Sequence, residues 1–224
     1  MKFKMLIIFT FIVAGCTSAP PTIQEGPNAE VSFDGLHKID NSRFADAWAD
    51  PEIDFSRYNK VLPGGAFFEF RAVKNTGRTT QRATSSTTEF YIEDSDRQRL
   101  EETVSGIFAE ELANSTRFEV TDKKGEDVLL LRGGLHDIVS NVPPDIIGRG
   151  EIWLSSVGEA TLIIEAVDSM SGETIFRAIE RRAAQRPGGT AMMSNTVTTW
   201  AEVRRLASRW AANLREGLDS IPTE

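Results

Sequence analysis

The sequence predicts an α+β domain with a mixed, mostly antiparallel sheet and helices packed on one face. Three observations support this prediction. Several strand-like stretches are apolar on one face and mixed on the other, which suits a sheet covered on one side only. Two longer stretches carry apolar residues at helical spacing. The 224 residues are 40% hydrophobic and 26% charged, which is ordinary for a globular domain. We therefore expect residues 31–224 to form one folded unit.

Residues 1–15 are predicted to be a lipoprotein signal peptide. Lys2 and Lys4 precede an apolar run of about ten residues, which is too short to cross a bilayer. Small residues then lead to the single cysteine of the chain. Val13-Ala14-Gly15-Cys16 resembles the bacterial lipobox, which implies cleavage between Gly15 and Cys16 and a lipid on the Cys16 sulfur. The alternative is an idle cysteine, which would be an unpaired thiol in an oxidising compartment.

Residues 16–30 are predicted to be a flexible tether. Pro20, Pro21 and Pro27 favour an extended, unpaired backbone, which would reach about 40 Å at roughly 3.1 Å per residue. Thr17 follows the cysteine, where inner-membrane retention in enteric bacteria usually uses Asp. By that resemblance we expect a lipid anchor in the outer membrane with the domain facing the periplasm. An inner-membrane location is the less expected one.

Charge and cysteine content exclude several classes of partner. Loss of residues 1–15 removes Lys2 and Lys4 and no acid, so the formal charge falls from -8 to -10. Nucleic acid and anionic headgroups are poor partners for such a surface. With Cys16 acylated, no thiol remains for a disulfide, a metal or catalysis. We expect neither a metal site nor a cofactor.

The first third of the domain shows no sustained helical or strand period before residue 54. Residues 33–48 are expected to be mostly irregular, with a short helical turn near Trp48. A β-rich stretch follows as far as Val73, and Pro63-Gly64-Gly65 inside it predicts a bulge or an edge position. The polar tract of residues 74–88 is expected to be a loop.

A first helix is predicted from Ser95, which forms a capping-box pattern with Gln98. Its apolar stripe consists of Leu100, Val104, Ile107, Phe108 and Leu112. Glu111 lies in the stripe, in the last turn, where we expect a glutamate at the rim that reaches water.

Two strands are predicted at residues 117–121 and 127–132, separated by a turn. The second continues to Val139 across Gly133-Gly134, where we expect a bulge. His136-Asp137 is the one spot that suggests acid–base chemistry. Adjacent residues on a strand point to opposite faces, however, so we predict no relay between them.

The clearest hairpin runs from Ala160 to Arg182 around the turn Ser169–Gly172, with alternating apolar residues on its first strand. A last helix is predicted from a cap formed by Thr199 and Glu202. Trp210 is near the centre of its apolar arc. Its opposite, solvated face is expected to carry Glu202, Arg205, Arg209, Asn213 and Glu216.

Several stretches carry a resemblance to a known family. They are residues 55–62, Phe-Ser-Arg-Tyr-Asn-Lys-Val-Leu, residues 157–160, Val-Gly-Glu-Ala, and residues 167–173, Val-Asp-Ser-Met-Ser-Gly-Glu. They look like those of the bacterial lipoproteins grouped as domain of unknown function 3313. The likeness extends from Phe33 to Asp219 and includes the Trp210 helix. Ser171 stands where a Thr is more usual. The resemblance implies a lipid-anchored envelope domain, and it brings no catalytic residues with it.

These observations favour a non-catalytic interaction or accessory module of a cell-envelope complex, held to the membrane by Cys16 and contacting an envelope protein. A carrier or receptor for a small or lipidic ligand is the alternative. An enzyme is the third possibility, based on His136 or on Glu159 with Glu165. Those two glutamates are six residues apart on one strand face, too distant to act together at about 3.3 Å per residue. We expect no catalytic residue.

Overall fold

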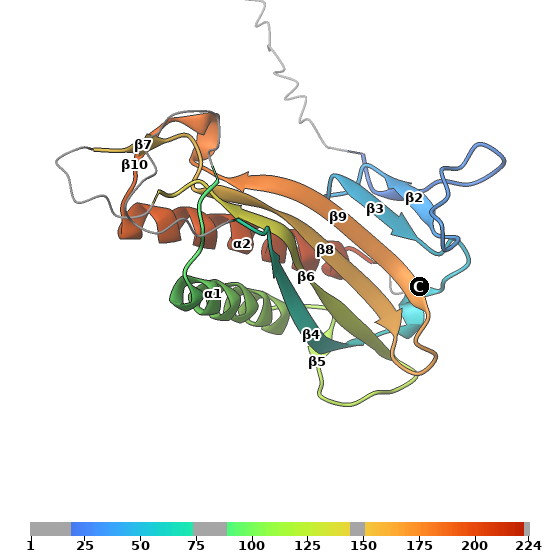
Figure 1. The fold of residues 1–224 in the computed structure, drawn as a ribbon. Coiled ribbons are helices and arrows are strands. Elements are labelled where there is room, and N and C mark those ends of the chain that lie inside the picture. Colours follow the sequence, from blue (N-terminus) through green and yellow to red (C-terminus); the bar gives the residue numbers. More distant parts are fainter. Residues whose placement is uncertain (1–18, 74–88, 144–150, 222–224) are drawn as a thin grey trace, which may run out of the picture.

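The computed structural model describes residues 19–73, 89–143 and 151–221. Its main feature is an eight-stranded sheet in the order β1-β2-β3-β9-β8-β6-β4-β5. Helices α1 (Asp94–Ala113) and α2 (Thr196–Asp219) both cover the same face of this sheet (Figure 1). The short strands β7 (Trp153–Leu154) and β10 (Met192–Met193) pair separately. The predicted α+β class is confirmed. No helix in these ranges is long and apolar enough to cross a membrane.

The long central strands explain why the sheet is mixed. Antiparallel pairing joins β6 (Val128–Ser140), β8 (Gly158–Asp168) and β9 (Thr174–Ala184). β4 (Lys60–Phe70) runs parallel to β6, because the chain returns through α1 before it enters the sheet again. β5 (Glu119–Val120) is parallel to β4 on its other side. The predicted hairpin is therefore the β8–β9 pair at the middle of the sheet.

Alternation along these strands builds the core. Leu162 and Ile164 of β8 and Leu131 and Leu135 of β6 point to the helices. Val104 and Leu112 of α1 meet them, as the predicted apolar stripe requires, and α2 contributes Trp210, Leu214 and Leu218. Trp210 is only 1% exposed. The side chains at the alternate positions of these strands point to the other side of the sheet, opposite α1 and α2, which we call the helix-free face.

The N-terminal segment differs from the prediction. Instead of an irregular chain with a helical turn, β2 (His37–Asp40) and β3 (Asp46–Ala49) form strands, and β3 pairs with β9. β3 is too short to show a period in the sequence. Its pairing partner, residues 176–179, lies far along the chain, so no local pattern indicates it. The expected tether of residues 16–30 also pairs: β1 (Thr22–Ile23) lies against Asp40 and Ile39. The unpaired part of the tether is therefore shorter than the spacing of prolines indicated.

Both predicted helix caps were wrong. α1 begins one residue earlier than expected, after Glu93, without a side-chain cap. α2 begins at Thr196, where Asn195 and Thr198 form the capping box instead of Thr199 and Glu202. Glu202 was expected in solvent, yet it is 2% exposed and bonded to Arg205. Near the start of α2, Val203 packs against a small buried cluster formed by Val157, Ala184 and Met192.

Gly133 and Gly134 serve close packing rather than a bulge. A Cβ at Gly134 would lie 1.9 Å from the carbonyl oxygen of Phe67, and one at Gly133 would lie 2.2 Å from that of Ile163. The irregularity beside them belongs to β4, between Pro63 and Ala66, as the Pro-Gly-Gly sequence indicated. The predicted signal peptide, the acylation site Cys16 and the loop of residues 74–88 lie outside the described residues.

Candidate functional site

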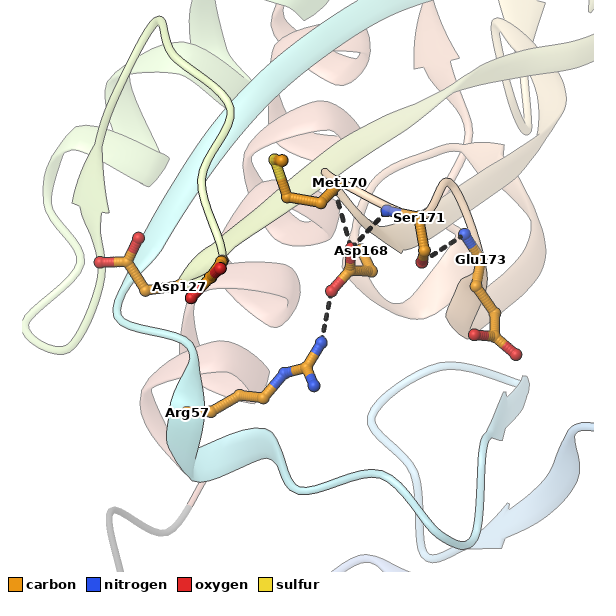
Figure 2. Close-up of a pocket in the computed structure, with 7 residues that line it drawn as sticks. Arg57, Asp127, Asp168, Met170, Ser171 and Glu173 are labelled. Atoms are coloured by element: carbon orange, nitrogen blue, oxygen red, sulfur yellow. Dashed lines mark hydrogen bonds and ion pairs between the residues drawn. The ribbon is translucent and has the colours of Figure 1, made fainter.

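Two of the stretches that carry the family resemblance, residues 55–62 and 167–173, meet at one corner of the sheet. The 3-10 turn η1 (Phe55–Arg57) leads into β4, and the β8–β9 turn begins at Asp168. Arg57 and the hydroxyl of Tyr58 both donate hydrogen bonds to Oδ2 of Asp168, the latter at 2.8 Å. Figure 2 shows Arg57 reaching across from η1 toward this carboxylate. We call these three residues, with Met170 and Ser171, the Asp168 corner.

The other oxygen of Asp168 shapes its own turn. Oδ1 accepts hydrogen bonds from the backbone N–H groups of Met170, at 2.9 Å, and Ser171, at 2.8 Å. Gly172 then takes φ +79, a left-handed conformation that favours glycine. The Asp-Ser-Met-Ser-Gly sequence thus specifies this turn through its first and last residues.

Hydrogen bonding fixes the charge state of the corner. Burial alone would raise the pKa of Asp168, but the donors Ser171, Tyr58, Met170 and Arg57 outweigh it and hold that pKa well below the usual range. Burial and the bond to this carboxylate raise the pKa of Tyr58 to about 12. Asp168 therefore stays ionised and Tyr58 stays protonated at neutral pH, and each is fully occupied by the other and by its neighbours.

A neighbouring hydrogen bond ties the corner to the start of β6. The hydroxyl of Ser169 donates to the carbonyl of Gly125, at 2.8 Å, and accepts from its N–H, at 3.1 Å. Ser169 is 2% exposed. η1, the residues before β6 and the β8–β9 turn are thus held in one arrangement.

The corner forms one wall of a surface depression of about 680 Å³. Its lining residues are Arg57, Glu126, Asp127, Asp168, Met170, Ser171 and Glu173. Met170 is 62% exposed, so this wall of the depression presents a large apolar side chain to solvent. In this depression Arg57 is paired with Asp168, and Lys60 is bonded to Asp127 at 2.7 Å. The other charged residues of the lining, Glu126 and Glu173, are acidic. This arrangement suits the binding of a basic or apolar group more than proton transfer.

The other residues considered from the sequence lie on the helix-free face. A bulge in β6, with Asp137 at φ +54, turns both His136 and Asp137 to this face. The expectation that they would point to opposite faces was wrong for this reason. They still do not bond each other: Nδ1 of His136 lies 2.6 Å from Glu69, and Asp137 accepts from Arg71 at 2.7 Å and Arg181 at 2.9 Å.

The two candidate glutamates are held apart by arginines. Glu159 pairs with Arg181, whereas Glu165 accepts from Arg132 and Arg177, each at 2.8 Å. Arg177 continues the series to Asp34, and its hydrogen bond lowers the pKa of Asp34 to about 2. The charged side chains on this face are thus arranged as neighbouring ion pairs of opposite sign. His37, the second histidine, bonds the carbonyl of Gln24, and Glu111 bonds Arg215 at 2.9 Å.

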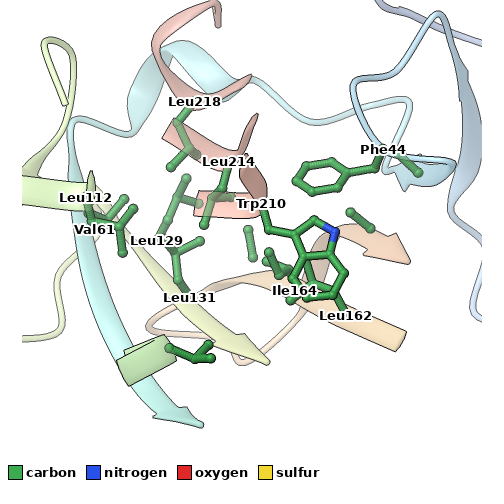
Figure 3. Packing of buried hydrophobic residues seen from close by; sticks show 14 of the residues in the cluster. Phe44, Val61, Leu112, Leu129, Leu131, Leu162, Ile164, Trp210, Leu214 and Leu218 are labelled. Carbon is green, nitrogen blue, oxygen red and sulfur yellow. The ribbon is translucent and has the colours of Figure 1, made fainter. Parts of the chain in front are cut away.

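Glu180 was not identified from the sequence. It is 2% exposed, points to the helices, and accepts a hydrogen bond from the indole N–H of Trp210 at 2.8 Å. Figure 3 shows that indole among Phe44, Leu162 and Ile164. Glu180 is the residue on β9 that pairs with the buried Leu162 of β8. A buried carboxylate needs a hydrogen-bond donor, so a glutamate on the apolar face of this strand could have been recognised from the sequence. In the described ranges no group of three or more His, Cys, Asp or Glu side chains could hold a metal ion.

Comparisons with known proteins place the chain in a family. The model described as "Protein of unknown function (DUF3313)" matches residues 31–214, which confirms the resemblance. No curated protein matches. Among solved structures, a PelC dodecamer from Paraburkholderia phytofirmans is 11% identical, with 73% of this chain and 95% of that chain covered and a TM-score of 0.34. Protein XCC0632 from Xanthomonas campestris, assigned to DUF330, is 14% identical, with 75% and 86% covered and a TM-score of 0.38.

Proposed function

Because this chain belongs to DUF3313, a family of proteins of unknown function, we propose its role from its own residues. It is a lipid-anchored, non-catalytic interaction module of a bacterial cell-envelope complex. It is attached through Cys16, by our expectation to the periplasmic side of the outer membrane, and it contacts an envelope protein at the Asp168 corner.

One observation carries this proposal: at the Asp168 corner the Asp168 carboxylate and the Tyr58 hydroxyl are already hydrogen-bonded, while the apolar side chain of Met170 is left exposed. The Asp168 carboxylate accepts four hydrogen bonds and Tyr58 donates its only proton to it. A catalytic group needs a free proton site or lone pair, which this network does not offer. A recognition surface needs a rigid frame that presents an anchor, and Met170 on its fixed turn is such an anchor.

The acidic rim indicates the chemistry of the partner. Glu126 and Glu173 line the depression beside Met170, and the whole chain is acidic at -8. A basic segment with an apolar residue would complement both features. A lipidic ligand, the alternative considered from the sequence, would have to bring its apolar part against this rim, so the corner favours a protein partner.

Site-specific photo-crosslinking in cells tests the proposal. A photoreactive amino acid at Met170 of the full-length chain should capture one envelope protein as a discrete band. The charge reversal Glu173→Lys should remove that band, because it replaces attraction to a basic segment by repulsion. Glu173 is exposed, so the change should leave the fold intact.

The control position is Ser105, which is exposed on the outer side of α1. A crosslink of the same kind from Ser105 would indicate non-specific capture in a crowded compartment. No band from Met170, or a band that Glu173→Lys leaves unchanged, would contradict the proposal. Activity of an untethered domain equal to that of the anchored one at the same copy number would favour an enzyme acting on a diffusing substrate.

A further inference from the structure

The turn of residues 32–35 carries a solvent-exposed aromatic side chain. Phe33 is 94% exposed and Val31 is 53% exposed. Large apolar side chains gain nothing from folding in such positions, so they mark contacts made outside the domain when a second feature indicates with what. The net negative charge of the chain does not explain why an aromatic side chain is exposed at this position.

The turn is rigid. The N–H of Gly35 donates to the carbonyl of Ser32 at 3.1 Å, and the N–H of Leu36 donates to the Ser32 hydroxyl at 3.0 Å. Asp34 forms two bonds to Arg177, at 3.0 and 2.6 Å. The guanidinium of Arg177 also lies 5.1 Å from the centre of the Phe33 ring. Phe33 is thus presented in a fixed position rather than left on a loose loop.

The length of chain before β1 indicates what Phe33 meets. Cys16 precedes Thr22 by six residues, which span at most about 20 Å. β1 is fixed on β2, where Thr22 is opposite Asp40. The turn begins at the far end of β2, beyond Leu36, about 13 Å away at roughly 3.3 Å per residue. A lipid on Cys16 would therefore keep this end of the domain within reach of the bilayer.

We propose that Phe33, with Val31 beside it, inserts into the lipid–water interface of the membrane to which Cys16 is anchored and thereby fixes the orientation of the domain. This inference rests on the lipid anchor of the proposed function. The contact is apolar, because Glu30 and Asp34 flank these residues and would not attract an anionic surface. Aromatic side chains are well suited to the interface.

Fluorescence quenching by labelled lipids tests this. The chain has a single cysteine, and acylation blocks it, so Phe33→Cys supplies the only reactive thiol of the lipidated protein. The variant is labelled with an environment-sensitive dye and reconstituted into phosphatidylcholine vesicles that contain a lipid with a doxyl group near the headgroup end of its acyl chain. We expect a blue-shifted emission that the doxyl lipid quenches, with no change on addition of salt.

The matched control is Val197→Cys, which is 76% exposed at the start of α2, at the other end of the molecule (Figure 1). The dye there should keep its emission in water and should not be quenched. Equal quenching at both positions, or none at position 33 in protein that floats with the vesicles, overturns the inference. Failure of the lipid anchor is separately visible, since wild-type protein would then take the dye at Cys16 and would not float.

Discussion

Asp168 is buried and ionised, so its contribution to stability should depend on pH in a defined direction. Its pKa is lowered in the folded chain, and the unfolded value is about 3.9. The stabilisation is therefore complete above about pH 4 and declines as the pH falls toward the folded pKa. Asp168→Asn should lower the free energy of unfolding by about 2 kcal/mol at neutral pH, because bonds to a charged acceptor are lost.

Urea unfolding of both proteins at neutral pH and near pH 3 would measure this. The difference between them should shrink at the lower pH. The exposed turn residue Asp122 provides a control, and Asp122→Asn should change stability little at either pH. A difference between wild type and Asp168→Asn that grows on acidification would contradict the role assigned to this carboxylate.

Trp210 contributes to stability in two separable ways. Trp210→Ala should cost about 3 to 5 kcal/mol, as for other buried aromatic residues. Trp210→Phe keeps most of the packing and removes the indole N–H that bonds Oε2 of Glu180, while Arg182 still donates to Oε1. We expect this change to cost about 2 kcal/mol. Calorimetric melting of the two variants would show the order, and a loss under about 1 kcal/mol for Trp210→Ala would mean that α2 is not docked as described.

At the scale of elements, the same substitution should act in opposite directions in the sheet and in a helix. Gly134→Ala places a methyl group against the backbone of β4, which cannot yield without breaking its pairing, and should cost about 3 kcal/mol. Gly106→Ala on α1 meets no atom within 4 Å and should stabilise the protein by about 1 kcal/mol. Chemical denaturation of both variants tests this, and a neutral Gly134→Ala would mean that β4 and β6 are less closely packed.

Elements with a strong period were predictable from the sequence, and elements defined by distant partners were not. The β8–β9 hairpin and the arcs of both helices follow from alternation and helical spacing within one segment. β3 forms because residues 176–179 pair with it, and no local pattern reports that. The helix caps were not predictable from local pattern either: several Ser, Thr and Asn side chains near residue 195 could accept the first N–H groups of α2, and α1 begins without a side-chain cap.

The candidate site was half predictable. The turn after Asp168 was recognisable, because Asp at its first position and Gly near its end have a local purpose. Its partner Arg57 lies 111 residues away in the sequence, and nothing local connects the two. The positions of His136 and Asp137 depended on a bulge without a glycine, which strand alternation does not anticipate.

At the scale of the whole molecule, Cys16 should decide where the domain resides. Cys16→Ala should yield an unprocessed precursor or a soluble form, and wild-type protein should sediment with outer membranes in a sucrose gradient, since Thr17 is not Asp. Cys16→Ala of full mature size in the membrane fraction would refute the anchor.

A soluble version with an ordinary signal should fold, lose most activity at native expression and recover part of it when overproduced, because confinement to a surface raises the effective concentration of a weak contact.

The pairing of β3 with β9 sets an order on folding. Residues 46–49 of β3 are synthesised early, yet their partners at 176–179 and the covering helix α2 follow only near the end of the chain. Contacts between such distant segments form slowly. During that interval β3 and its neighbours present open backbone groups, so the nascent chain is most open to misassembly or proteolysis just before its last fifth arrives.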